Sequence, residues 1–324
     1  MLHEESAEEY EKQEGRLAMD NVTAVFEFFL IGISNYPEWR GTFFTFILIV
    51  YLSTMLGNGF IIFLIHFDPH LHTPMYFFLS NLSFLDLCYG TASMPQALVH
   101  CFSTHPYLSY SRCLTQMSVS LTLATAECLL LAVMAYDRVV AISNPLRYSV
   151  VMNGPVCVWL AATSWGTSIL LSVILVSSLR LQFCGANVIN HFVCEILSLI
   201  RLACSDTSLN ELMIFTTGIF TLLLPFGFVL LSYVRIVAAV LRIRSAQGRL
   251  KAFSTCGSHL TVVTIFYGAA ISMYIKPKSK SSPNQDKFIS VFYGALTPML
   301  NPLIYSLRNK DVKGAIRKFM VKRA

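Results

Sequence analysis

The chain has 324 residues, of which 55% are hydrophobic and only 13% are charged, and its formal net charge is +6. About a quarter of the residues of an ordinary soluble domain are charged. This composition excludes a soluble globular protein and a disordered chain, because it has too few polar groups to cover a wet surface or to keep the chain unfolded. Nine cysteines are too few for a small disulfide-held scaffold.

Residues 1–40 are expected to form an extracellular tail. Met1 to Asp20 contain seven acidic residues and no apolar run, which is typical of a disordered segment and not of a cleavable signal. The sequon Asn21-Val22-Thr23 makes Asn21 a candidate glycosylation site.

Residues 41–308 contain seven segments long and apolar enough to cross a bilayer as helices, which takes about 20 residues. They do not alternate apolar with polar residues as the strands of a membrane barrel would. The sequence therefore predicts an all-α membrane protein, a seven-transmembrane helix bundle. The predicted spans are Thr42–Ile65, Met75–Cys101, Leu114–Ala135, Val156–Val176, Met213–Val234, Ala252–Ile275 and Phe288–Leu307.

The positions of Lys and Arg predict the orientation of these spans. If the amino end is outside, the inner loops and tail contain 14 of the 24 basic residues but only three of the 18 acidic residues. Basic residues gather on the cytoplasmic side of membrane proteins. We therefore expect a multi-pass plasma-membrane protein with an extracellular amino end and a cytoplasmic carboxyl end.

Two acidic residues lie inside the predicted spans, Asp86 in the second and Glu127 in the third. Glu127 precedes Arg138 by 11 residues, which is three helical turns or about 16 Å, so both side chains face the same way. An isolated carboxylate in hydrocarbon is unfavourable, and this face is therefore expected to point into the bundle.

The longest loop, residues 178–212, is expected outside and contains Cys184, Cys194 and Cys204, while Cys113 opens the third span. Four cysteines in an oxidising compartment form two disulfides, and the spacing leaves all three pairings open.

The carboxyl end, residues 309–324, is expected to be a cytoplasmic tail. Val312, Ile316, Phe319 and Met320 recur at helical spacing between basic residues. This pattern predicts a short amphipathic helix that lies on the anionic inner leaflet and contacts membrane lipid.

No catalytic or nucleic-acid-binding pattern is found. The sequence has no phosphate-binding glycine loop, zinc-ligand spacing or nucleophile elbow, and its basic tail suits lipid and a protein partner and not nucleic acid. His66, His70 and His72 border the inner face and are better explained as interfacial polar residues than as metal ligands. A transporter or channel is the alternative class, but the internal repeats typical of such folds are missing.

Five motifs then carry a family resemblance. They are Leu71 to Leu79 (LHTPMYFFL), Met134 to Ile142 (MAYDRVVAI), Ser232-Tyr233, Lys251 to Leu260 (KAFSTCGSHL) and Pro298 to Tyr305 (PMLNPLIY). In this order they resemble the odorant receptors, within the rhodopsin-like G protein-coupled receptors, and the His-Thr-Pro form is similar to the tetrapod-type class. The run from Lys251 to His259 argues against a peptide or lipid receptor of the same superfamily.

The resemblance implies a disulfide pairing and a set of residues that control activation. It implies disulfides Cys113–Cys194 and Cys184–Cys204, which would make the long loop a fixed lid. Arg138 beside Asp137 resembles the arginine that is restrained in the inactive state and released toward a G protein. Tyr233 and His259 resemble its polar partners, and Asn301, Pro302 and Tyr305 resemble the hinge of the seventh helix. Without the resemblance, Asp137 and Arg138 would suit an interfacial ion pair and His259 a structural histidine.

The same fold would bring Asn58, Asp86, Glu127 and Asn301 together. Two acids in one dry site share a proton or hold a cation, so Asp86 and Glu127 form a candidate sodium site and no other cofactor is expected. The alternative is a neutral, hydrogen-bonded cluster that only fixes packing.

The expected ligand is a small, neutral, volatile molecule bound in the outer half of the bundle. No acid lies in the outer part of the third helix to bind an amine, and no lysine lies within the seventh helix to bind retinal. Lys276, Lys278 and Lys280 leave an anionic ligand as the alternative. The implied partner is a stimulatory G protein that raises cyclic AMP, and the oligomeric state stays open. The predicted lining is Met117, Ser120, Leu121, Ala124, Thr125, Thr217, Thr221, Tyr267, Ala270, Tyr274, Ser290 and Tyr293.

Overall fold

The computed structural model describes residues 27–32, 37–103, 106–184, 187–274, 287, 289–308 and 310–321. The predicted glycosylation site Asn21 and the lysines Lys276, Lys278 and Lys280 lie outside these residues, and so do the side chains of Tyr274 and Tyr293.

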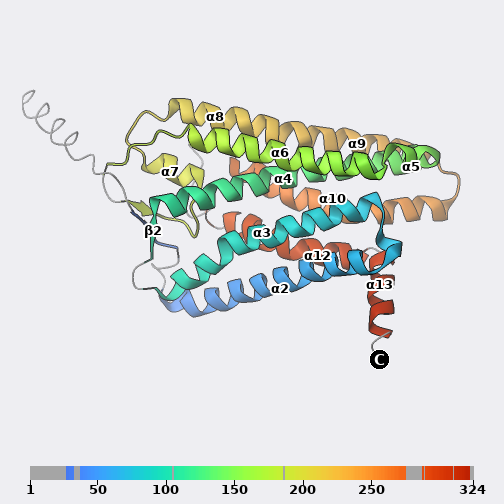
Figure 1. Cartoon of the computed structure of the whole chain (residues 1–324), viewed down its shortest axis with the longest axis horizontal. Coiled ribbons are helices and arrows are strands. Elements are labelled where there is room, and N and C mark those ends of the chain that lie inside the picture. The colour runs from blue at the N-terminus through green and yellow to red at the C-terminus, as the bar shows by residue number, and fades with distance from the viewer. Residues whose placement is uncertain are drawn as a thin grey trace, which may run out of the picture.

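The described chain is a bundle of long helices that lie side by side (Figure 1). The first four spans are α2 (Arg40–Phe67), α3 (Pro74–Phe102), α4 (Tyr110–Ser143) and α6 (Gly154–Ser177). The fifth is continuous through α8 (Ser208–Gly218), the π-helical turn η4 (Ile219–Leu223) and α9 (Leu224–Leu241). The sixth is α10 (Ala246–Tyr274), and the seventh includes the π-helical turn η6 (Phe292–Leu296) and α12 (Thr297–Arg308).

The expected seven-helix architecture is confirmed. By length and composition, five of the described helices are able to cross a membrane by themselves: Arg40–Phe67, Tyr110–Ser143, Gly154–Ser177, Ser208–Leu241 and Cys256–Met273. Several helices extend past the predicted spans because apolarity marks only the hydrocarbon depth, whereas a helix continues into the interface. Asp137 and Arg138, for example, lie within α4 and not beyond it.

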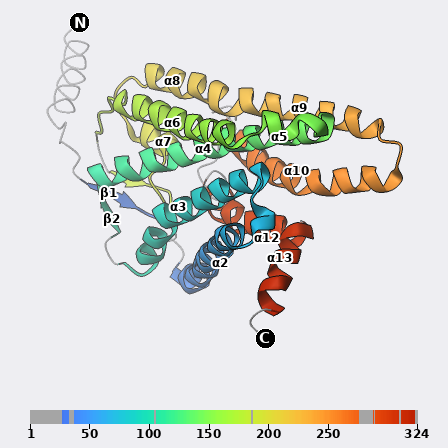
Figure 2. The ribbon, with the colours of Figure 1, turned by 45° about the vertical axis from the view of Figure 1, so that its right-hand side comes forward.

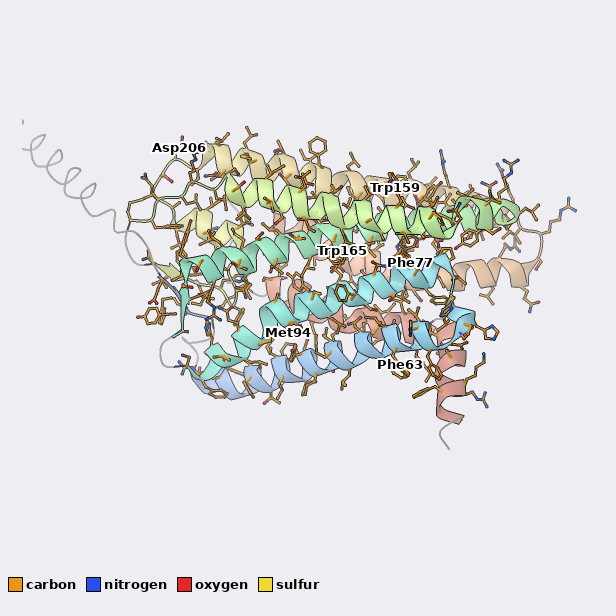
Figure 3. All side chains as sticks on the ribbon, in the orientation of Figure 1. Phe63, Phe77, Met94, Trp159, Trp165 and Asp206 are labelled. Carbon is orange, nitrogen blue, oxygen red and sulfur yellow. A yellow bond between two sulfur atoms is a disulfide. The ribbon has the colours of Figure 1, made fainter. Side chains whose placement is uncertain are left out.

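Large apolar side chains cover the outside of this bundle. Trp159 is 66% exposed and Phe63 is 43% exposed, and Figure 3 shows the side chains that project from the helices. A soluble protein would bury such groups, so this surface matches a hydrocarbon solvent.

The all-α expectation misses a small sheet at the outer end. Strand β1 (Glu27–Leu30) lies between β2 (Tyr107–Ser109), which is antiparallel to it, and β3 (Val188–Ile189), which is parallel. Phe28 and Leu30 of β1 are buried, so this part of the expected tail packs onto the protein. These strands are only two to four residues long and come from three distant segments, so no local alternation predicts them.

One close approach, between α2 and α12, shapes the inner half. Gly57 of α2 faces Pro302 of α12 so closely that a Cβ atom at Gly57 would lie 2.9 Å from Pro302 Cγ. Pro302 lies inside α12, where its missing N–H permits a bend.

The carboxyl-terminal helix α13 (Lys310–Val321) turns away from α12 at the inner end of the bundle and projects to the side, past the end of α2 (Figure 2). Its apolar face is more buried than a helix lying on a leaflet would require. Val312 is 1% exposed and Phe319 packs 5.5 Å from the ring of Phe63 on α2. On its polar side, Lys318 Nζ lies 3.6 Å from Asp68 Oδ2. The predicted helix is therefore present, but helix α2 covers part of the face that was expected to meet lipid.

Candidate functional site

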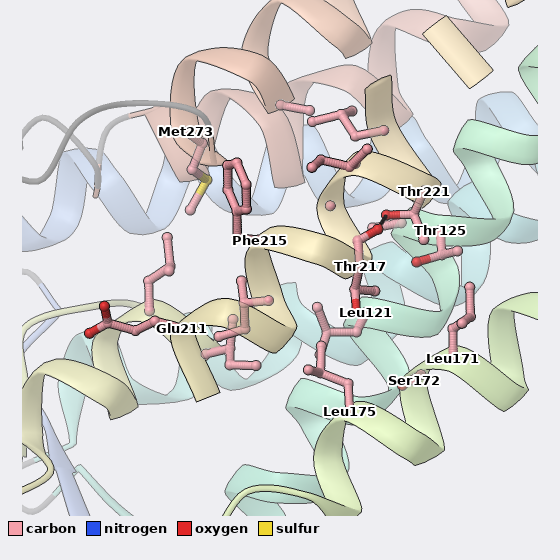
Figure 4. A pocket seen from close by; sticks show the side chains of 18 of the residues that line it. Leu121, Thr125, Leu171, Ser172, Leu175, Glu211, Phe215, Thr217, Thr221 and Met273 are labelled. Atoms are coloured by element: carbon pink, nitrogen blue, oxygen red, sulfur yellow. Dashed lines mark hydrogen bonds between the residues drawn. The ribbon is translucent and has the colours of Figure 1, made fainter. Parts of the chain in front are cut away.

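A cavity of about 900 Å³ lies in the outer half of the bundle, between α4, α6, the α8–η4 segment and α10 (Figure 4). The short lid helix α7 (Ile196–Leu202) from the long outer loop also contributes to its wall. The lining consists of Leu121, Ala124, Thr125, Cys128, Leu171, Ser172, Leu175, Ile196, Leu197, Ile200, Arg201, Ser208, Glu211, Leu212, Ile214, Phe215, Thr217, Gly218, Ile219, Thr221, Leu222, Leu223, Ala270 and Met273.

The lining is chiefly apolar with a few hydroxyl groups. Its two charged residues, Arg201 and Glu211, have opposite signs, so the wall has no net charge. The Thr221 hydroxyl donates to the Thr217 carbonyl at 2.9 Å, which leaves its oxygen available as an acceptor toward the cavity. Such a site suits a small neutral molecule held by dispersion and one or two hydrogen bonds.

Six of the predicted lining residues contribute to this wall: Leu121, Ala124, Thr125, Thr217, Thr221 and Ala270. Four others do not. Met117 is 1% exposed and packs in the core beneath the lid, and the buried Tyr267 donates its hydroxyl to the Cys128 carbonyl at 3.0 Å. Ser120 and Ser290 also lie off the wall. The cavity is displaced toward α6 and away from the seventh helix, and the phase of a helix cannot predict such a displacement.

Sequence reasoning missed the contributions of α6 and of the lid. Ser164, Ser168 and Ser172 recur at a spacing of four residues, which marks a polar face of α6 and was the available signal. Ser172 lines the cavity and donates to the Ser118 carbonyl on α4 at 2.8 Å. Glu211 is absent from the predicted lining because the sequence argument considered an acid only in the outer part of the third helix.

The lid is tied to the bundle by covalent and polar bonds. The structure contains the disulfides Cys113–Cys194 and Cys184–Cys204, the pairing that the resemblance implies. Gln116 on α4 accepts a hydrogen bond from the Cys194 amide at 2.9 Å and donates to the Ala92 carbonyl at 3.0 Å. These contacts hold the lid against both α4 and α3.

Asp206 stabilises the amino end of α8. Its carboxylate accepts hydrogen bonds from the Ser208 hydroxyl at 2.6 Å and the Ser208 amide at 3.0 Å. These bonds lower the pKa of Asp206, so the carboxylate stays ionised at neutral pH and suits the amino end of a helix.

A buried polar cluster lies below the cavity. Asn301 Nδ2 donates to both oxygens of Asp86, at 3.2 and 3.0 Å, and Asn58 Nδ2 donates to the Pro298 carbonyl at 2.9 Å. Glu127 is 4% exposed. Two oxygens of this cluster, Glu127 Oε1 and Asn58 Oδ1, have no hydrogen-bond partner among the described residues. Within the same residues, no group of three or more His, Cys, Asp or Glu side chains could hold a metal ion.

At the inner end of α4, Arg138 is paired with its neighbour Asp137, and both side chains are buried. Tyr148, from the short helix α5 (Tyr148–Val151), donates its hydroxyl to Asp137 Oδ1 at 2.7 Å. Asp137 therefore holds both the arginine and the second inner loop.

Tyr233 and His259, which were expected to be polar partners of Arg138, bond to each other. The Tyr233 hydroxyl lies 2.7 Å from His259 Nδ1, and His259 Nε2 lies 3.1 Å from the Leu131 carbonyl. Because a carbonyl only accepts, Nε2 carries the proton and Nδ1 accepts from the tyrosine. His259 thus joins α10 to both α4 and α9. The Tyr305 hydroxyl is buried and has no partner among the described residues.

A seven-helix bundle with a lidded outer cavity and a restrained arginine at its inner end defines a membrane receptor of the rhodopsin-like type. The chain belongs to the olfactory receptor family, since the family model described as "Olfactory receptor" matches residues 46–323.

Human relatives agree with this assignment. The chain is 83% identical to human Olfactory receptor 13H1 over 307 residues, which are 95% of this chain and all of that protein. It is 50% identical to human Olfactory receptor 13D1 over 93% of this chain and 87% of that protein, and 50% identical to human Olfactory receptor 2K2 over 94% and 96%. The protein is thus an odorant receptor of the membrane and not an enzyme.

Proposed function

We propose that this receptor binds a small neutral odorant in the cavity beneath the lid and activates a stimulatory G protein that raises cyclic AMP. The observation that carries the proposal is the cavity itself, which is large enough for an odorant, chiefly apolar and without net charge. The proposed setting is the plasma membrane, with the amino end outside and the basic α13 against the inner leaflet.

The contacts between α4 and α10 support a route from the cavity to Arg138. Cys128 and Ala270 line the cavity, and the Cys128 carbonyl accepts from Tyr267 of α10. About one turn further along α4, the Leu131 carbonyl contacts His259, which also belongs to α10. A ligand that prefers a different spacing of α4 and α10 would shift both contacts, and with them the population in which Arg138 leaves Asp137.

We further propose that the buried acidic cluster holds sodium or a shared proton. Glu127 Oε1 and Asn58 Oδ1, together with the carboxylate of Asp86, offer the oxygen donors that a hard cation prefers. A bound cation would supply a charge that balances the two carboxylates. Asn301 would position Asp86 through its two hydrogen bonds.

The ligand site is tested by a cyclic-AMP screen of cells that express the receptor against a broad odorant panel. Gly218→Leu places a side chain where the structure has open space on the cavity wall, so it should abolish or change the response. Gly227→Leu is the matched control, because Gly227 lies on the same continuous helix, has open space around it and is not part of the wall. An unaltered odorant profile of Gly218→Leu would contradict the site.

Two further variants test the switch and the acidic cluster. Arg138→Ala should abolish the response while surface expression is kept, and a response that survives intact would overturn the role of Arg138. Glu127→Gln removes one charge and should alter basal or odorant-driven signalling in a sodium- or pH-dependent way. If signalling by Glu127→Gln matches that of the parent across sodium concentrations and pH, the cluster is only structural.

A further inference from the structure

The cavity wall is exposed at one side of the bundle. Leu212 and Phe215 of α8 line the cavity, yet they are 57% and 60% exposed. A side chain that both lines a cavity and reaches the surface marks a place where the cavity meets its surroundings. Figure 4 shows Phe215 extending from α8 toward Met273 of α10.

This opening lies at the outer border of the hydrocarbon, because the fifth predicted span begins at Met213, two residues before Phe215. Phe215 is seven residues into α8, which is about 10 Å below the start of that helix. Further in, α10 packs against η4 and α9, whereas α8 is not among the described elements that it packs against closely. The two helices therefore diverge toward the outside and leave Phe215 between them.

The outer end of the cavity has a different character. There the lid is anchored to α4 by the Cys113–Cys194 disulfide and closed on itself by Cys184–Cys204. The charged residues Arg201 and Glu211 line the wall at this end. An apolar molecule entering from water would have to displace or desolvate these charged groups, which is unfavourable. Among the described wall residues, those exposed at the side opening are the apolar Leu212 and Phe215.

We propose that odorants enter the cavity from the bilayer, between α8 and α10, and that Phe215 is the gate. This inference rests on the proposed ligand site and specifies its ligand class, which is compounds that partition into hydrocarbon. Partition concentrates such compounds near the opening by about fourfold for each methylene group. Selectivity would then depend on membrane partition as well as on the fit to the wall.

Thiol labelling of the full-length receptor in cell membranes tests the route without an odorant. Thr217→Cys places a thiol on the cavity wall. N-phenylmaleimide, which enters the bilayer, is compared with a sulfonated maleimide that stays in the external water. Each rate is normalised to that reagent's rate with a free thiol, and labelling is read at residue 217 by mass spectrometry. We expect N-phenylmaleimide to label at least about tenfold faster, from the partition of an aromatic ring into hydrocarbon.

Gate variants in the Thr217→Cys background should change this rate in opposite directions. Phe215→Ala should speed labelling by N-phenylmaleimide, and Leu212→Trp should slow it. The matched controls Phe220→Ala and Leu209→Trp should leave the rate unchanged. Phe220 and Leu209 belong to the same continuous helix and are 65% and 68% exposed, but they are not part of the cavity wall.

The outcomes separate the route from the receptor function. Faster labelling by the sulfonated reagent, no labelling by either reagent, or gate variants that behave like their controls would overturn the lateral route. If the receptor with such a result still responds to odorants, the lateral route is wrong but the proposed ligand site is not contradicted. Labelling as expected in a receptor whose odorant response is unaltered by Gly218→Leu would instead contradict the proposed function.

Discussion

A glycine pair on α2 allows a sharp test of the inner packing. Gly57→Ala would place a methyl group 2.9 Å from Cγ and 3.3 Å from Cβ of Pro302 on α12. Carbon atoms pack at about 3.5–4.0 Å. The proline ring cannot rotate away, so α2 and α12 would have to separate by about 0.6–1.1 Å to restore that spacing. Gly59→Ala, two residues along the same helix, meets nothing within 4 Å.

The two substitutions differ only in this steric conflict. Each replaces glycine by alanine within a helix, which favours the helix by about 0.8–1.0 kcal/mol. Overpacking at Gly57 costs about 1–3 kcal/mol. Because the helix propensity cancels in the comparison, Gly57→Ala should be less stable than Gly59→Ala by about 1–3 kcal/mol. This difference corresponds to roughly 2–6 °C in the melting temperature.

The measurement is the thermal stability of each detergent-solubilised variant, read as loss of the monodisperse peak in fluorescence-detected size-exclusion chromatography. The parent receptor is included, and Gly59→Ala should melt at or slightly above its temperature. Equal melting temperatures for the two variants would refute the close packing of Gly57 on Pro302. A lower value for Gly59→Ala than for Gly57→Ala would do so more strongly.

Three further predictions concern the lid, the α9–α10 contact and the inner loop. Gln116→Leu removes the acceptor for the Cys194 amide, so it should lower thermal stability by about 1–3 kcal/mol. Gln96, whose side-chain oxygen accepts from Gln116 Nε2 at 2.9 Å, is the comparison: Gln96→Leu should have a smaller effect, because Gln116 keeps its bonds to the Ala92 carbonyl and the Cys194 amide. Tyr233→Phe keeps the ring but leaves His259 Nδ1 unpaired, so it should cost about 1–3 kcal/mol, and a neutral result would refute that hydrogen bond. The His70 amide, which donates to Asp68, holds the pKa of Asp68 below its usual value. The stabilising contribution of ionised Asp68 is therefore present above its unfolded pKa and is lost only as the pH falls through the lowered pKa in the folded protein. Consequently, the melting difference between Asp68→Asn and the parent should persist at pH 5, and a difference that is present at pH 7 but vanishes at pH 5 would contradict the lowered pKa.

Properties that depend on composition and on local spacing were predictable from the chain alone. A segment in hydrocarbon must satisfy its backbone hydrogen bonds internally, so it forms a helix, and it must be apolar over the whole thickness of the bilayer. All seven spans can therefore be recognised in the sequence. The helical spacing of Val312, Ile316 and Phe319 likewise predicted α13, and the ordered motifs predicted the family that the comparisons then established.

Only the tertiary structure decided how these elements meet. The strands β1, β2 and β3 are too short to have a pattern, and they pair because three distant segments, one of them part of the long outer loop, meet at the outer end of the bundle. Likewise, the phase of α4 predicted Leu121, Ala124 and Thr125 on the cavity wall, but the displacement of the cavity toward α6 left Met117 and Tyr267 out of it. Such outcomes depend on the tilt and separation of neighbouring helices, which arise from packing between residues far apart in the chain.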